Sequence, residues 1–290
     1  MKITYKILSI FIFLILISIF YLSIFGIETD KFNSQITNKI KIFNNEINVE
    51  LKKIKIVLDP FKLKLNIKTA GSKFINQNQI IEIESIQTQI SLKSLIEDKS
   101  SIENMKISTK SIEVKNLISF SRSIKNSVEL FILEKIVKKG YLIADLKLEF
   151  DSNGNIKDNY KIDGFIKDAK LSFLNKYDLN KLNLIFSYQK NNLIIGDTVL
   201  QLNDQNFKSK AISLKKVKDE FIINGDIRHD KLNLNSKNLN LFIKPYFPNL
   251  NVEKINFSSK SNFSFQVNKK INIKNFEINS EMIIDELVFL

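Results

Sequence analysis

The stretch that decides the fold is Ile7–Phe25, ILSIFIFLILISIFYLSIF, which contains 19 residues and no charged side chain. A helix of this length is about 28 Å long, close to the thickness of the hydrocarbon core of a bilayer. The segment therefore predicts a transmembrane anchor. Its candidate membrane-contacting residues are Ile7, Phe11, Leu14, Ile17, Phe20 and Phe25.

The flanks of this segment carry charges of opposite sign. Lys2 and Lys6 precede it, and Glu28 and Asp30 follow it. Because positive flanks favour the cytoplasmic side, we expect a cytoplasmic N-terminus, one span and the bulk of the chain outside the cytoplasm. A cleaved signal peptide and a buried core helix are the alternatives. The apolar core is long for a signal peptide, no Ala-x-Ala-like site follows it, and it has no polar face.

Composition limits the function classes. The chain has 290 residues, no Cys and a net charge of +13, so any exported part must be stabilised by strand pairing and burial rather than by disulfides. Nearly all basic residues are Lys, whereas Arg is favoured for bidentate contacts with phosphates and bases. No basic cluster follows one helix face, so we expect no nucleic-acid partner. Attraction to anionic lipid head groups stays open.

Helical periodicity predicts two amphipathic helices after the anchor. In Asp30–Asn45, apolar residues recur at three- or four-residue steps, with Asp30 as the expected N-cap. In Leu117–Lys138, one apolar stripe predicts a single long helix, with Asn116 capping its start and Gly140 at the C′ position. Charged residues interrupt that helix, so we do not expect a second span.

Most of the remaining chain alternates apolar and polar residues, which predicts strands. Ile47–Leu58 reads as one stretch with a bulge at Lys52–Lys53, the turn Asp59–Pro60 follows, and Phe61–Ile67 forms the next strand. A short helix is expected around Leu92–Glu97.

From Tyr141 to Leu290 we expect almost only antiparallel strands joined by short polar links, including a strand at Leu239–Ile243. The predicted fold is mainly β: an N-terminal transmembrane helix, then an elongated, curved, mostly antiparallel sheet with a hydrophobic groove and a few amphipathic helices. The expected regions are 1–28 (cytoplasmic tip and anchor), 29–140 (membrane-proximal α+β) and 141–290 (repetitive β).

The chain contains an internal repeat. Ile162–Leu171 and Ile223–Leu232 share the pattern Ile-x-Gly-x-Ile-x-x-x-Lys-Leu. We interpret each copy as a strand whose Gly permits a bend or close packing. The repeat supports a sheet built from similar units.

Residues with catalytic or metal-binding chemistry are few. His229 is the only His, and although Asp226 and Asp230 are near it, we expect a surface histidine in a turn rather than a metal ligand. The sequence DSNGN at 151–155 predicts a hairpin turn carried by Asn153–Gly154 rather than a calcium loop. Without a Cys nucleophile or a Gly-rich phosphate loop, we expect no enzyme, no metal site and no cofactor. A hydrolase would have to act through His229 or a carboxylate.

The sheet has more apolar face than its helices can cover. Two amphipathic helices are too few for about fifteen strands, so the uncovered face must meet lipid, meet a partner or fold on itself. We favour a lipid-facing groove, with Leu63, Leu65, Ile67, Leu184 and Phe186 as candidate lining residues. The alternative is a packed β-domain that serves as a membrane-anchored scaffold and binds a protein partner at the Phe289–Leu290 edge.

The arrangement resembles the AsmA-like family, which includes the TamB and YhdP groups. The resemblance rests on the span Ile7–Phe25, the helix from Asp30, the strands Ile47–Leu58 and Phe61–Ile67, and the Ile-x-Gly-x-Ile repeats. It covers most of the chain as architecture and transfers no functional residue.

The resemblance implies a single-pass protein of the inner membrane, with its bulk in the periplasm and a long curved sheet whose concave groove carries phospholipid acyl chains toward the outer membrane. Its implied partners are the inner membrane, phospholipids and an outer-membrane or periplasmic protein. The chain is short for a bridge across the periplasm, and its apolar end favours the N-terminal portion of a longer member.

Overall fold

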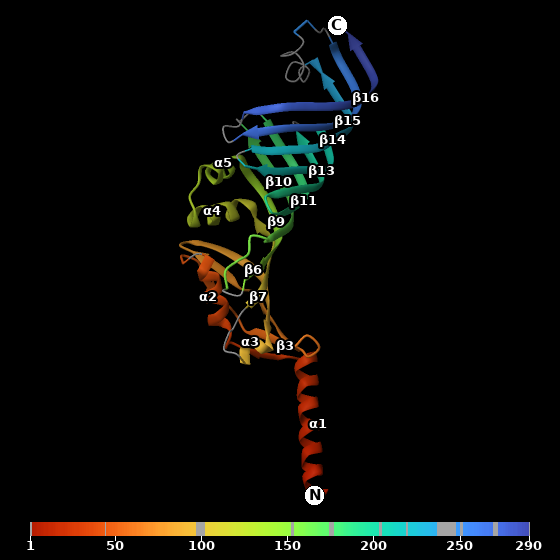
Figure 1. Cartoon of the computed structure of the whole chain (residues 1–290). Helices are drawn as coiled ribbons and strands as arrows, with labels where there is room; N and C mark the ends of the chain where they lie inside the picture. Colours follow the sequence, from red (N-terminus) through yellow and green to blue (C-terminus); the bar gives the residue numbers. More distant parts are fainter. Residues whose placement is uncertain are drawn as a thin grey trace. The chain divides into compact units, whose positions relative to one another are not determined.

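The structure, a computed structural model, describes most of the chain. The described residues are 2–43, 45–96, 102–151, 154–173, 177–202, 205–218, 220–236, 248–249, 252–268 and 272–289. Most of them lie in antiparallel strands, and helices α1–α5 all precede residue 137 (Figure 1). The predicted mainly β fold with an N-terminal apolar helix and few further helices is confirmed. The expected strand at Leu239–Ile243, with Asn153 and Leu290, falls outside the described residues.

The chain folds as two compact units whose segments alternate along the sequence. Unit 1 comprises Met1–Ile112, Asn116–Phe131 and Ile143–Ile162, and unit 2 comprises Glu113–Lys115, Ile132–Leu142 and Asp163–Leu290. Helix α5 and strand β9 contribute residues to both units.

The elements as far as β9 are α1 Lys2–Ile24, β1 Ile27–Thr29, α2 Asn33–Phe43, β2 Asn48–Glu50, β3 Ile54–Asp59, β4 Lys64–Ala70, β5 Lys73–Asn76, β6 Gln79–Ser91, α3 Leu92–Ile96, β7 Ile102–Thr109, β8 Ile112–Glu113, α4 Val114–Ile124, α5 Val128–Ile136 and β9 Val137–Glu149. The strands that follow are β10 Lys161–Phe173, β11 Tyr177–Gln189, β12 Asn192–Leu202, β13 Gln205–Val217, β14 Glu220–Asn235, β15 Val252–Asn268 and β16 Ile273–Phe289.

Helix α1 is long and apolar enough to cross a membrane. Its stretch Thr4–Ile24 has none of its most apolar window buried against the rest of the protein. The Ser18 and Ser23 hydroxyls donate to backbone carbonyls one turn earlier, which satisfies these polar groups within the helix.

The helix ends at a glycine that leads straight into the sheet of unit 1. The N–H groups of Phe25 and Gly26 both donate to the Tyr21 carbonyl, and Gly26 adopts the left-handed conformation with φ +67°. Strand β1 follows at once and pairs with β3, with Ile27 opposite Ile56. A Cβ at position 26 would lie 2.3 Å from the Ile56 carbonyl oxygen, so only glycine fits this junction.

Unit 1 has a closed hydrophobic core. Its sheet runs in the order β1-β3-β4-β6-β7-β9, and β2 and β5 extend it beside β6. Ile54 and Ile86 are fully buried, and Ile67 is 1% exposed. Helix α2 adds Ile36 and Ile40 to the same cluster, and helix α4 adds Phe120. These two helices therefore seal much of the apolar face, and each fully buried Ile contributes about 1.5–3 kcal/mol.

The predicted helix within residues 30–45 is present as α2, but its predicted N-cap is not. Helix α2 begins at Asn33, and the Asp30 backbone carbonyl accepts from the Asn33 N–H. The predicted side-chain cap at Asp30 is therefore wrong.

Two strand predictions in unit 1 are wrong in detail. Ile47–Leu58 is not one bulged strand, because β2 pairs with β5 whereas β3 pairs with β1 and β4. Phe61 and Leu63 lie in a turn, with Phe61 99% exposed and Leu63 at φ +52°, and β4 begins only at Lys64. The turn after Asp59 is present, and the Lys62 N–H donates to the Asp59 carboxylate across it.

The predicted single helix Leu117–Lys138 is two helices. Helix α4 ends at Ile124, and α5 starts after Ser127, whose hydroxyl accepts from the Leu130 N–H as a cap. Strand β9 begins directly after α5, so Gly140 lies within a strand at φ +137° rather than at a helix C′ position.

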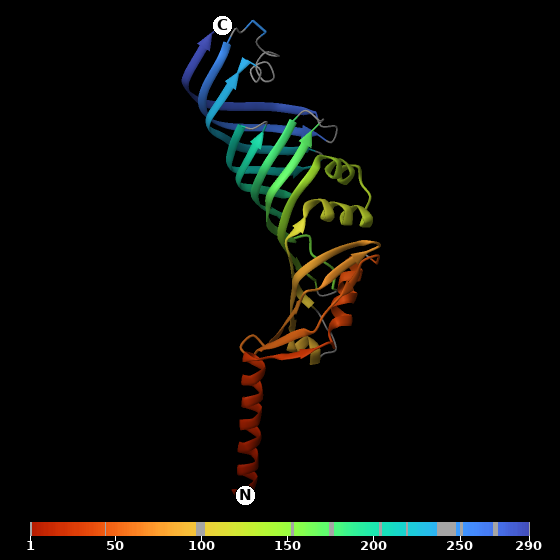
Figure 2. The ribbon, with the colours of Figure 1, turned by 180° about the vertical axis from the view of Figure 1, so that it is seen from behind.

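Unit 2 is a meander in which each strand pairs with the next in sequence. Its order is β9-β10-β11-β12-β13-β14-β15-β16. The long strands bend along their length, as the green to blue part of Figure 2 shows. The predicted run of antiparallel strands after residue 141 is confirmed for the described residues.

Irregular positions recur on neighbouring strands of unit 2. Asp168 on β10, Lys181 on β11 and Asp197 on β12 all have positive φ near +50°. The register shifts on β13 between Lys208 and Ile212, and on β14 between His229 and Leu232. Such bulges add twist and bend a strand, which accounts for the curvature of this unit.

Both copies of the sequence repeat lie on strands that carry one of these irregularities. In β10 the irregular residue is Asp168, two positions before the repeat's Lys-Leu, and in β14 the register shifts between His229 and Leu232, across the corresponding positions. Close packing at the repeat glycine is confirmed for Gly225, where a Cβ would lie 2.9 Å from the side chains of Ile212 and Phe263.

Candidate functional site

Unit 2 carries continuous rows of apolar side chains across its strands. Directly paired residues project from the same face of a sheet, so the register defines each row. The first row is Tyr188, Leu193, Leu214, Ile223 and Phe265. The second row is Phe186, Ile195, Ile212, Gly225, Phe263 and Ile278. We call these two rows the apolar face.

The apolar face is only half-buried. All its side chains on β11–β15 are intermediate in exposure, and Ile278 on the edge strand β16 is 56% exposed. Phe276 extends the first row, with its ring centroid 6.1 Å from that of Phe265. Within the described residues, the face therefore remains accessible to an apolar ligand.

At Gly225 the side chains on the two neighbouring strands of the second row come close together. Its missing side chain lets Ile212 and Phe263 approach each other from the two neighbouring strands. The row therefore stays continuous at the one position that lacks an apolar side chain.

A polar belt borders the apolar face. Ser261 accepts from the Ser280 hydroxyl at 2.8 Å, and Thr198 pairs directly with Ser209. Thr198, Ser209 and Ser261 are all buried, which is unusual for hydroxyl side chains on a sheet of this kind.

His229 belongs to this belt, so the expectation of a surface histidine in a turn is wrong. It lies within β14, is 8% exposed, and its Nε2 is 2.8 Å from the Ser259 hydroxyl. Its ring packs edge-on against Phe207 and Phe257. Burial lowers the pKa of His229, against the opposing effect of the Asp230 carboxylate, and thereby favours the neutral form of the ring.

The carboxylates near His229 serve other partners. Asp226 accepts from the backbone N–H groups of Lys210 and Ala211, each at 2.9 Å, and thereby holds the bulge of β13. Burial alone would raise the pKa of Asp226, but these amides and Arg228 hold it below its usual value. Among the described residues, no three side chains with metal-binding groups gather at one place.

A smaller apolar cluster lies beyond the belt. Leu232, Leu234 and Phe257 are buried there, with Phe207 and Ile255 packed against them. The same strands therefore present two apolar zones separated by hydroxyl groups.

The structure divides the predicted groove residues between the two units. Leu63 is in a turn and 62% exposed, Leu65 packs partly buried against the core of unit 1, and Ile67 is inside that core. Leu184 and Phe186 lie on β11 of unit 2, both partly buried, and Phe186 belongs to the apolar face.

The predicted anchor residues all lie at or near α1 and are exposed. Their exposed fractions are 62% for Ile7, 60% for Phe11, 55% for Leu14, 47% for Ile17, 65% for Phe20 and 60% for Phe25.

Sequence reasoning missed most of the apolar face. Ile195, Ile212 and Phe263 belong to alternating stretches, but alternation alone does not say which strands align them. The one signal available was the repeat glycine, since Gly225 brings the neighbouring side chains together.

Comparison of the chain with known protein families, with curated proteins and with solved structures found no match. The function proposed for the chain therefore rests on its own geometry.

Proposed function

We propose that this chain is a membrane-anchored, non-enzymatic protein whose apolar face in unit 2 binds the acyl chains of phospholipids. The observation that carries the proposal is the pair of apolar rows that cross β11–β16 and stay only partly buried. An extended apolar surface left uncovered in a folded protein marks a binding surface for an apolar partner.

The rows suit a chain-like ligand. They run perpendicular to the strands, and neighbouring strands lie about 4.8 Å apart, so five strand intervals extend about 24 Å. An acyl chain of a membrane lipid has a comparable length. A ligand along the rows would exchange water for the side chains of both rows, at about 25 cal/mol for each Å² of apolar surface removed from water.

Helix α1 supports a location of this function at a membrane. Its exposed apolar surface suits insertion, and we propose a single span in the inner membrane with the following units in the periplasm. The AsmA-like resemblance supports this location and the further proposal that lipid passes toward the outer membrane. The phospholipids of the inner membrane would then be the partners of the apolar face.

Adjacent residues on β12 provide a matched test. Ile195 belongs to the apolar face, whereas its neighbour Ile194 points to the opposite side and is 47% exposed. We would place a photoreactive amino acid at position 195, 212 or 263 of the full chain in membranes that contain radiolabelled phospholipid. The controls carry the same probe at position 194 or 199.

Lipid adducts are expected at the three inner positions and not at the two control positions. The proposal is refuted if no inner position gives an adduct or if both faces react equally. Because all five positions lie outside α1, lipid that merely surrounds the anchor does not affect the result.

The exposed strand β16 supports a second candidate, an anchored scaffold. Ile278, Met282 and Ile283 on this strand are each more than half exposed. An apolar edge strand can pair with a strand of another protein. Crosslinking from β16 to one protein, together with an apolar face that gives no lipid adduct, would favour the scaffold.

A further inference from the structure

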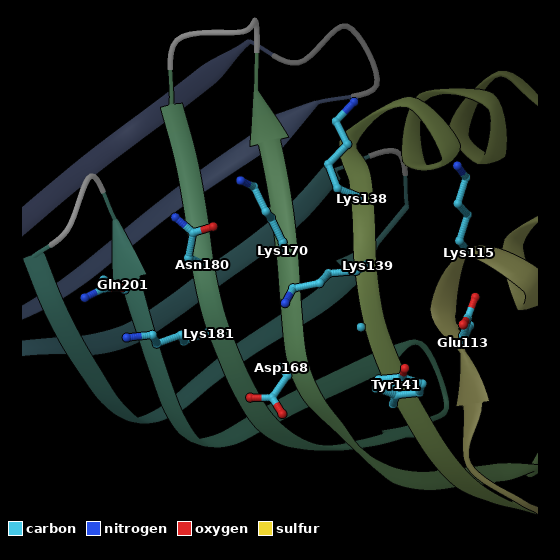
Figure 3. Close-up of a pocket in the computed structure, with 11 residues that line it drawn as sticks. Glu113, Lys115, Lys138, Lys139, Tyr141, Asp168, Lys170, Asn180, Lys181 and Gln201 are labelled. Carbon is cyan, nitrogen blue, oxygen red and sulfur yellow. The ribbon is translucent and has the colours of Figure 1, made fainter.

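A basic cleft lies on unit 2, separate from the apolar face. Its volume is about 840 Å³, within the size range of small-molecule sites. It contains five lysines, which Figure 3 shows on four elements: Lys138 and Lys139 on β9, Lys170 on β10, Lys181 on β11 and Lys115 in the first turn of α4.

The fraction of lysine among the residues that line this cleft is well above the fraction in the whole chain. Five of the eleven lining residues are Lys, and Glu113 and Asp168 are the two acidic ones. In the whole chain, Lys and Arg together make up 44 of 290 residues. The general basic character of the protein therefore does not account for the local excess.

Several of these ammonium groups are not neutralised. Lys138 donates to the Lys135 backbone carbonyl, and Lys170 lies 3.6 Å from the Asp178 carboxylate. The ammonium groups of Lys115, Lys139 and Lys181 make no hydrogen bond or ion pair with another described residue. A concave site with several unpaired cations attracts anions, because the field of the charges adds within it.

The irregular backbone of these strands builds the cleft. Asp168 and Lys181 adopt positive φ, and the Asp168 N–H donates to the Asn183 side chain at 3.0 Å, which fixes the bulge. At Gly140 a Cβ would lie 2.7 Å from Ala169 Cβ, so β9 and β10 approach closely. The cleft is thus set by the backbone rather than by mobile side chains alone.

None of the residues that line the cleft belongs to the two rows of the apolar face. Asn180 and Gln201 line it and are direct partners, one residue along from the Leu179–Leu202 pair. Leu200 and Leu202 lie two residues apart on β12 and therefore project from one face of the sheet. Leu200 pairs with Phe207, whose ring packs against that of His229. The inference below therefore does not depend on lipid binding by the apolar face.

We propose that this cleft binds an anion that carries phosphate together with hydroxyl groups. Lysine ammonium groups bind phosphate oxygens as point charges, and several of them at one site favour a ligand with more than one negative charge. The Glu113 and Asp168 carboxylates accept hydrogen bonds from hydroxyls and repel a ligand that is anionic throughout. A phosphorylated sugar and a glycerophosphate lipid head group share this chemistry.

Two probes distinguish these sources. Fructose 1,6-bisphosphate, titrated by calorimetry into the full chain held in phosphatidylcholine nanodiscs, represents the free ligand. Co-flotation of those nanodiscs with phosphatidylglycerol-containing vesicles represents the lipid head group. Both are measured at about 150 mM salt, where non-specific surface attraction is largely screened.

The cleft variant is Lys139→Gln, Lys170→Gln and Lys181→Gln together. The control, Lys215→Gln, Lys216→Gln and Lys231→Gln, removes the same charge from exposed positions of unit 2 outside the cleft. We expect the cleft variant to weaken binding at least about tenfold and the control less than about twofold. A third variant with Arg at the three cleft positions keeps the charge and should retain most of the binding.

Binding of the bisphosphate alone would identify a free phosphorylated ligand, and binding of the vesicles alone would identify a head group. Equal loss in the cleft and control variants, or binding of neither probe by the wild-type chain, overturns the proposal. Unchanged thermal unfolding of the variants shows that the fold is retained.

Discussion

The two units use the same kind of strand but differ in what covers it. In unit 1, sixteen buried apolar residues form one cluster, which α2 and α4 help to close. In unit 2 the largest buried cluster among the described residues contains three, and the apolar face stays partly exposed. Isoleucine-rich alternation alone therefore does not decide whether a face becomes core or surface. A face becomes core where a helix covers it, as α2 and α4 do in unit 1.

The largest expected effect comes from shortening one isoleucine in each unit. Ile54→Ala should cost about 2–5 kcal/mol, because it leaves a cavity in a closed core. Ile212→Ala should cost less than about 1 kcal/mol, since water already reaches its half-buried site. Hydrogen exchange of the full chain, followed by mass spectrometry, reports each unit separately. Equal losses would show that the two units are packed equally tightly at these positions.

Glycine substitutions test how each unit tolerates an added methyl group. Gly26→Ala should destabilise unit 1 by about 2–3 kcal/mol, because the Cβ meets a backbone oxygen and φ is positive. Gly225→Ala in unit 2 meets only the ends of Ile212 and Phe263, which can shift, so about 1 kcal/mol is expected. The same exchange measurement checks both. A greater loss for Gly225→Ala would show that the apolar face is as tightly packed as a core.

The carboxylate that holds the bulge of β13 gives a smaller effect. Asp226→Asn should lower the stability of unit 2 by about 1 kcal/mol at pH 7. Because the folded-state pKa of Asp226 is depressed, its contribution is present above the unfolded-state value and is lost as pH falls below about 4. The variant and wild type should therefore converge in acid-dependent unfolding.

The matched control in unit 1 is Asp145→Asn. Burial opposes the lowered pKa of Asp145, and Lys106 and Ser108 maintain it. Its side chain is 36% exposed, so we expect a change within a few tenths of a kcal/mol. A larger loss for Asp145→Asn than for Asp226→Asn would contradict a special role for the bulge.

The smallest effect is a pH dependence confined to unit 2. His229 is the only histidine, and burial depresses its pKa. Its contribution is therefore present above the unfolded-state pKa of about 6.5 and is lost as pH falls toward the folded-state value. Between about pH 7 and 5.5, unit 2 should lose less than about 1 kcal/mol, and His229→Phe should abolish the loss. Exchange in unit 1 serves as the internal reference, and an equal loss there would argue against His229 as the cause.

The element types were largely predictable from the sequence. The alternating residues around Phe186 do form a strand, and the apolar patterns of α1 and α2 do form helices. The break between α4 and α5 was harder, since the apolar stripe continues across it with the same period. Ser127 was the available signal, as a capping residue inside an apparently continuous helix.

The positions of the bulges could not be predicted. Asp168, Lys181 and Asp197 occupy the left-handed conformation without being glycines, so composition gives little warning. Each bulge changes which residues share a face, and therefore which side chains form the apolar face and which line the basic cleft. The prediction that Leu63 lies in a strand was wrong for the same reason, because Leu63 has a positive φ and ends the turn before β4.

Gly26 has a mechanical consequence. A flexible linker of ten Gly and Ser residues would let its ends separate by about 17 Å and would absorb any motion of a helix. The single left-handed residue between α1 and β1 leaves no such slack. With α1 embedded as proposed, its tilt follows the thickness of the surrounding bilayer. A change in that tilt would then act directly on the β1 edge of unit 1, with no flexible segment to absorb it.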